Sequence, residues 1–143
     1  ILTGGKRPTT PNQGWYYEPT IISCPDQKLT IVDTELFGPV LSVMRFDDEE
    51  EVLNLANDSK YGLAAGIFTT NQARAMRMTQ SVHAGIVWVN TYRMVSPIAP
   101  FGGYKDSGYG RESGMDAIYD YTRPKTAWIN ISDAPIGNPF VMR

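Results

Sequence analysis

The chain has 143 residues, 42% of them hydrophobic and 20% charged, which is typical of one folded domain rich in turns. Thirteen lysines and arginines against fifteen aspartates and glutamates give a net charge of -2, which argues against a nucleic-acid partner. Cys24 is the only cysteine, so no disulfide can form within the chain. No apolar run is long enough for a signal peptide or a membrane span, and we expect a cytoplasmic protein with no membrane partner.

Strands and helices alternate through the first two thirds of the sequence. After a turn-rich start, a strand is predicted over residues 20–23 and a buried strand over 40–46. Asp47 or Asp48 is a good N-cap for a helix that ends near Asn57. A strand over 63–70, a helix capped by Thr70 or Asn71, and a strand over 84–90 follow. This β-α-β-α-β order predicts an α/β fold with a parallel sheet covered by helices.

The chain changes character after Asn90. Residues 91–114 contain five glycines and are too long for an idle connection, so we expect a loop that binds a ligand or packs on another domain. A short helix over 115–121 and an alternating strand that begins at Lys125 and ends at Ile131 come next, before an extended tail.

Several candidate sites have a simpler structural explanation. Cys24 and the lone histidine, His83, are far apart in the sequence, and no cluster has metal-ligand spacing, so neither a thiol site nor a metal site is predicted. The acids at 47–51 are expected to cap a helix and face solvent. The loop glycines have the wrong spacing for a dinucleotide fingerprint and are expected to serve tight turns or close backbone approach: Gly108, Gly110 and Gly114.

Glu35 and Phe37 stand before the strand at 40–46, next to a Gly-Pro turn, where no capping role is needed. A carboxylate can accept hydrogen bonds from a vicinal diol such as a ribose, and a ring offers a flat apolar face to a heterocycle. On these properties alone, a structural and a functional role weigh equally.

Four segments, in this order, resemble the C-terminal third of the aldehyde dehydrogenase superfamily: "TELFGPV", "ANDSKYGLAAGIFT", "AGIVWVN" and "PFGGYKDSGYGRESG". The resemblance starts at "GGKR" and runs to "YTRPKTAWINI". It implies that residues 1–120 are part of a catalytic domain of this type and that 121–143 hold an oligomerisation strand and tail. The Rossmann-like cofactor domain of the family is absent from these residues.

The resemblance also implies roles for individual residues. Glu35 is expected to accept hydrogen bonds from the nicotinamide ribose of NAD or NADP, and Phe37 to brace the nicotinamide ring. Arg93, Val95 and Phe101 are expected to line the substrate tunnel. The chain departs from some family members at Thr34, where a second acid is common, and at Arg93 and Val95, where an acid and an aromatic occur. Two explanations of Arg93 stay open: it favours an aldehyde that bears a carboxylate, or it is a surface arginine satisfied by a local acid.

The family oxidises aldehydes to acids through a thioester on a cysteine, which a glutamate-activated water hydrolyses. Both residues are expected before residue 1, so this chain has no catalytic residue of its own and is expected to be inactive alone. Its expected partners are the missing N-terminal part, a small-molecule aldehyde, and further copies joined through residues 125–131 as a homo-oligomer. The alternative is a non-catalytic structural or assembly protein derived from the family.

Overall fold

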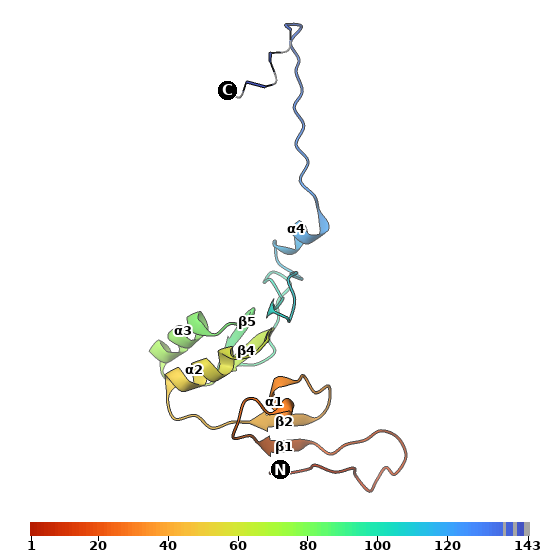
Figure 1. Ribbon diagram of the computed structural model, residues 1–143, viewed down its shortest axis with the longest axis vertical. Helices are drawn as coiled ribbons and strands as arrows, with labels where there is room; N and C mark the ends of the chain where they lie inside the picture. The colour runs from red at the N-terminus through yellow and green to blue at the C-terminus, as the bar shows by residue number, and fades with distance from the viewer. Residues whose placement is uncertain (136, 139, 142–143) are drawn as a thin grey trace.

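The computed structural model describes residues 1–135, 137–138 and 140–141. The molecule is elongated: two groups of helices and strands lie at one end, and an extended C-terminal segment reaches away from them (Figure 1). In these described residues, no helix has both the length and the hydropathy needed to cross a membrane. The tail expected after residue 131 includes positions 136, 139 and 142–143, which lie outside the described residues.

The first group is a parallel pair of strands, β1 (Thr20–Ser23) and β2 (Val40–Val43), which run in register along their whole length. A short helix, α1 (Thr30–Asp33), lies in the connection between them and was not predicted. The strand predicted over 40–46 ends at Val43, because β1 offers no partner beyond Ser23 and the last ladder bond runs from the Cys24 amide to the Val43 carbonyl. The prediction that this strand is buried is wrong for β2. It has only one neighbouring strand, and Leu41 is 58% exposed.

The second group is a β-α-β unit. β4 (Ala64–Ile67) and β5 (Ile86–Val89) pair in parallel, and α3 (Gln72–Ser81) connects them and packs against both strands. Asn71 caps α3 by accepting a hydrogen bond from the Arg74 amide at 2.9 Å, which confirms one of the two predicted caps. The α/β class with parallel strands is therefore confirmed.

The strands do not join into one continuous sheet within the described residues. β1 pairs with β2, β4 with β5, and the short β3 (Tyr61–Gly62) pairs antiparallel with β6 (Tyr104–Lys105). The alternating pattern predicted that the strand at 40–46 and the strand at 63–70 belong to one sheet. Among the described residues this single sheet is not seen: β2 is paired only with β1 and β4 only with β5.

α2 (Glu49–Asn57) is held at its N-terminus by Asp48, whose side chain accepts a hydrogen bond from the Glu51 amide at 2.8 Å. Glu49 does not simply face solvent, as predicted for the acids at 47–51. It binds Arg77 at 2.8 and 2.9 Å and Arg74 at 3.1 Å, which ties α2 to α3. Arg77 above all, with Arg74, lowers the pKa of Glu49 to about 2.

The last helix, α4 (Ala117–Tyr121), confirms the short helix predicted near 115–121. The strand predicted over 125–131 is not formed within the described chain. These residues are extended and carry exposed apolar side chains, with Trp128 at 94% and Ile131 at 95%. A strand is defined by the neighbour that it bonds to, and this segment runs away from the rest of the molecule (Figure 1).

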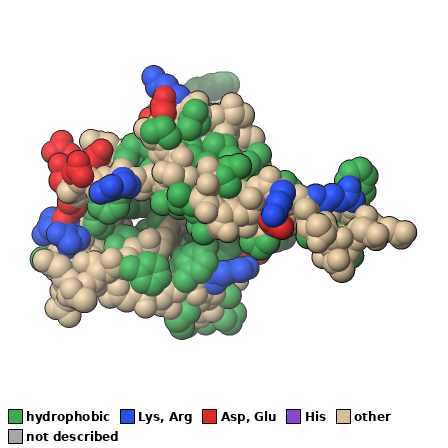
Figure 2. Space-filling model, turned by 90° about the horizontal axis from the view of Figure 1, so that it is seen from below, with side chains coloured by type: hydrophobic (Ala, Val, Ile, Leu, Met, Phe, Trp, Pro, Cys, Tyr) green, Lys and Arg blue, Asp and Glu red, His purple; other side chains and the backbone are tan. Residues whose placement is uncertain are grey.

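The core is small. Its most buried residues are Thr20, Cys24, Met78 and Ala84. Many large apolar side chains remain exposed, and Figure 2 shows hydrophobic groups spread across the face seen from below. Surfaces of this kind suit packing against further protein.

Candidate functional site

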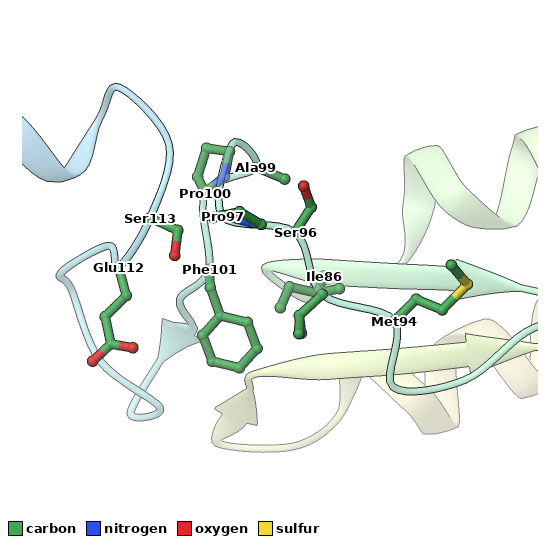
Figure 3. Close-up of a pocket in the computed structure, with 10 residues that line it drawn as sticks. Ile86, Met94, Ser96, Pro97, Ala99, Pro100, Phe101, Glu112 and Ser113 are labelled. Atoms are coloured by element: carbon green, nitrogen blue, oxygen red, sulfur yellow. The ribbon is translucent and has the colours of Figure 1, made fainter.

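The long loop after β5 folds back on the start of that strand and lines an open cavity of about 660 Å³. In Figure 3 the Phe101 ring lies between Glu112 and Ile86, with Pro97, Ala99 and Pro100 above it in this view. The lining is mainly apolar and comes from β5 and two parts of the loop: Ile86, Met94, Val95, Ser96, Pro97, Ala99, Pro100, Phe101, Glu112 and Ser113.

β5 fixes the start of this loop. The Trp88 indole donates a hydrogen bond from Nε1 to the Met94 carbonyl at 2.7 Å, and its ring meets the edge of Tyr92 with centroids 5.3 Å apart. Asn90 closes the carboxyl end of β5 by two side-chain hydrogen bonds of 2.8 Å with the backbone of Thr69. The loop therefore leaves the strand along a defined path.

The far end of the loop is held by close backbone contact. A Cβ atom at Gly85 would lie 1.8 Å from the Gly102 carbonyl oxygen, so only glycine allows this approach. The Arg111 guanidinium donates to the carbonyls of Gly103 and Gly110, each at 2.9 Å.

The "GGYKDSG" segment anchors the loop to the C-terminal end of α2 and to β3. Lys105 Nζ donates to the carbonyls of Asn57 and Ser59 at 2.7 and 2.8 Å, at the C-terminal end of α2. The Ser107 hydroxyl accepts a hydrogen bond from the Gly62 amide at 3.0 Å.

The cavity contains two of the three residues predicted for the substrate tunnel. Val95 and Phe101 line it, whereas Arg93 is not among the lining residues. Arg93 has a φ of +59°, a left-handed conformation that is uncommon for a residue with a side chain. The roles of all three in binding an aldehyde stay predictions.

Glu112 and Ser113 were not predicted as site residues. They reach the cavity because Phe101 and Glu112 exchange two backbone hydrogen bonds of 2.7 Å, which pull the end of the loop against its middle. This contact joins two irregular segments, so no hydrophobic period in the sequence could have revealed it.

Glu35 lies elsewhere, in the segment that leads from α1 into β2. It lines a second cavity of about 540 Å³ together with residues from α1, α2, β3 and β4. Phe37 does not line that cavity, and its ring is fully accessible at 98%. The two residues are close in sequence but do not share this cavity.

Cys24 and two of the loop glycines lie in surroundings that give them a local structural role. Cys24 is 3% exposed and its thiol donates only weakly, at 3.7 Å, to the Ile22 carbonyl. Gly108 and Gly114 have φ angles of +125° and +65°, which turns require and glycine permits. Among the described residues, no cluster of three or more His, Cys, Asp or Glu side chains could hold a metal ion.

Comparison with known protein families identifies the family of the chain. Residues 1–127 match the model of the aldehyde dehydrogenase family. The chain belongs to the aldehyde dehydrogenase family. The resemblance deduced from the four ordered segments is confirmed.

Individual relatives match this chain over nearly its whole length. It is 53% identical to (Z)-2-((N-methylformamido)methylene)-5-hydroxybutyrolactone dehydrogenase of Acinetobacter baylyi, over 100% of this chain and 29% of that protein. It superposes on PnpE from Pseudomonas sp. WBC-3 with a TM-score of 0.86 and 45% identity, covering 97% of this chain and 28% of PnpE.

An NAD+ complex of the aldehyde dehydrogenase from Bacillus cereus gives a TM-score of 0.84 at 44% identity, over 91% of this chain and 26% of that one. PnpE has also been solved with nicotinamide adenine dinucleotide. The chain thus spans less than a third of the length of these relatives.

Proposed function

We propose that this chain is part of an NAD-dependent aldehyde dehydrogenase that oxidises an aldehyde to a carboxylic acid through a cysteine thioester. The observation that carries the proposal is the apolar cavity, because Val95 and Phe101, both expected in the substrate tunnel, line it in a chain of this family. The nucleophilic cysteine and the general-base glutamate are proposed to lie outside these 143 residues.

The residues proposed to hold the nicotinamide end of the cofactor suit that task. Within the described chain the Glu35 side chain has no hydrogen-bond partner, and it borders a cavity, so its two oxygens are free to accept from ribose hydroxyls. Phe37 presents an uncovered ring that can lie against a flat heterocycle. Bound NAD+ supplies the acceptor for the hydride that leaves the substrate.

The cavity residues are proposed to position the aldehyde and keep water away from it. An apolar lining favours the hydrocarbon part of a substrate, and Phe101 offers the largest apolar surface there. Arg93, outside the lining, is proposed to favour an aldehyde with a distal carboxylate by a charge-assisted hydrogen bond.

Relatives solved with NAD+ support NAD as the cofactor, and NADP stays the second possibility. The cytoplasmic location and a homo-oligomer joined through residues 125–131 are further parts of the proposal.

The Glu35→Gln variant of the full-length protein tests the cofactor role. Replacing the charged acceptor weakens its hydrogen bonds to the ribose, and we expect kcat to fall about ten-fold, since such bonds contribute about 1.5–3 kcal/mol. The thermal midpoint should stay unchanged, because the side chain is exposed. NADH formation is followed by absorbance, with Glu50→Gln on α2 as the matched control. An unchanged rate in Glu35→Gln would refute the assignment.

The alternative is a family-derived structural or assembly protein without chemistry. A cysteine and a glutamate in the family's motifs upstream would exclude it. We also expect the purified 143-residue chain to form no NADH from aldehydes, because the proposed nucleophile and cofactor domain are not in it. Measurable turnover by this chain alone would contradict that part of the proposal.

A further inference from the structure

One side chain of β5 reaches the wall of the cavity without lining it. Trp88 Nε1 donates to the Met94 carbonyl at 2.7 Å, and Met94 and the next residue, Val95, both line the cavity. Trp88 itself is not among the lining residues. Its contact is with the backbone of the wall rather than with the space inside.

The strand gives Trp88 a firm base. Residues two apart on a strand share a face, so Ile86 and Trp88 point the same way. Ile86 forms part of the cavity lining, and Trp88 holds the loop that closes over it. In β4, Gly66 lies opposite Trp88 in the register, and the Tyr92 ring lies over it, 3.5 Å from where a Cβ atom would be, which is an ordinary van der Waals distance.

The loop needs such a restraint at this point. Arg93, immediately before Met94, has a φ of +59°, which costs about 1–2 kcal/mol for a residue with a Cβ atom. A conformation of this kind persists only where its surroundings fix it. The Trp88 bond to the next residue and the edge contact with Tyr92 provide that restraint on either side of Arg93.

We propose that Trp88 is a positioning residue for substrate specificity: its hydrogen bond to Met94 sets the wall formed by Met94 and Val95, and thereby the fit of long apolar aldehydes. This inference rests on the proposed function of the cavity. Short aldehydes, which do not extend to this wall, are insensitive to it.

The test uses the full-length protein with the Trp88→Phe substitution, which keeps an aromatic ring beside Tyr92 but removes the donor. Initial rates are measured with acetaldehyde and with hexanal at saturating NAD+. We expect KM for hexanal to rise about five-fold, the effect of one lost neutral hydrogen bond, while kcat for both aldehydes and KM for acetaldehyde stay unchanged. Tyr92→Leu, which removes the edge contact and leaves the donor, should give a smaller rise.

Trp15→Phe, at an exposed indole, is the matched control, and thermal midpoints check that each variant is folded. An equal rise in KM for both aldehydes would show a general structural effect and overturn the inference. Phe101→Ala separates the two proposals. If it raises KM for hexanal and Trp88→Phe does not, the positioning role alone is wrong. If neither variant raises KM, the cavity does not hold the aldehyde and both proposals are wrong.

Discussion

Arg93 carries its guanidinium on a left-handed backbone, immediately before Met94 in the cavity lining. Three tunnel residues were predicted within nine positions of one loop, and the cavity collects Val95 and Phe101 but not Arg93. Residues close in sequence lie close in space, whereas the direction in which each side chain points depends on the local backbone. The left-handed φ of Arg93 belongs to the folded loop and has no signature in the residue type, since glycine or asparagine is usual there.

The charge of Arg93 gives the residue-scale prediction. In the full-length protein, Arg93→Ala should lower kcat/KM for succinic semialdehyde about ten-fold, because a charged hydrogen bond of about 1.5 kcal/mol is lost. Butyraldehyde, which has the same chain length and no carboxylate, should be unaffected. Steady-state rates on the two substrates check this.

Two further variants separate charge from backbone. Arg93→Gly removes the same charge but suits the left-handed φ, so it should show the same substrate selectivity with equal or higher thermal stability. Arg123→Ala, at an exposed arginine beyond α4, is the control and should change neither substrate. Equal losses on both aldehydes in Arg93→Ala would contradict a charge role.

Helices were predicted better than sheets in this chain. The caps at Asp48 and Asn71 were recognisable because a cap and the amide that it binds are three residues apart, within reach of a local pattern. Strand pairing depends on segments far apart in sequence. No local sequence pattern indicated that β2 would pair with β1 rather than with β4. The two-residue strands β3 and β6 have too few positions to produce any period.

The connection between α2 and α3 gives a prediction about pH. Glu49 has its pKa lowered to about 2 by Arg77 first and Arg74 second, against 4.5 for the free side chain. Because the folded pKa is the lower one, this contribution to stability is complete above about pH 4.5 and is lost as the pH falls towards 2. Thermal midpoints of the full-length protein and its Glu49→Gln variant should differ at pH 6 and converge as the pH falls to about 2.

Glu50→Gln provides the control for that comparison, because Glu50 is on the same helix and has no ion-pair partner among the described residues. Its midpoint should follow that of the unsubstituted protein at every pH. A difference between Glu49→Gln and the unsubstituted protein that persists unchanged to pH 2 would show that the ion pairs do not stabilise the fold.

At the scale of the whole molecule, the dominant feature is apolar surface that the chain does not cover itself. The segment 125–131 alternates like a strand, is extended and carries Trp128, Ile129 and Ile131 exposed to solvent. Its alternating pattern predicted a strand, but a strand requires a partner, and the sequence does not say which molecule supplies it.

If this segment completes a sheet in a neighbouring subunit, its removal should reduce the oligomer. We expect the full-length protein truncated after residue 124 to sediment as a smaller species than the intact protein, with more aggregation through the newly uncovered surface. Truncation after residue 132 keeps the segment and should leave the sedimentation coefficient almost unchanged. Identical sedimentation of the two truncated proteins would rule out residues 125–131 as the joint.

The contact between Gly85 and Gly102 has a consequence for protein engineering. This contact and the hydrogen bond from Trp88 to Met94 flank a short stretch, residues 95–101. They hold its two ends against β5 and the residue before it. We expect side chains between these two contacts to be exchangeable with little change in β5. The stretch therefore behaves as an exchangeable cassette, and grafting it between relatives offers a compact route to new aldehyde preferences, provided that both glycines are retained.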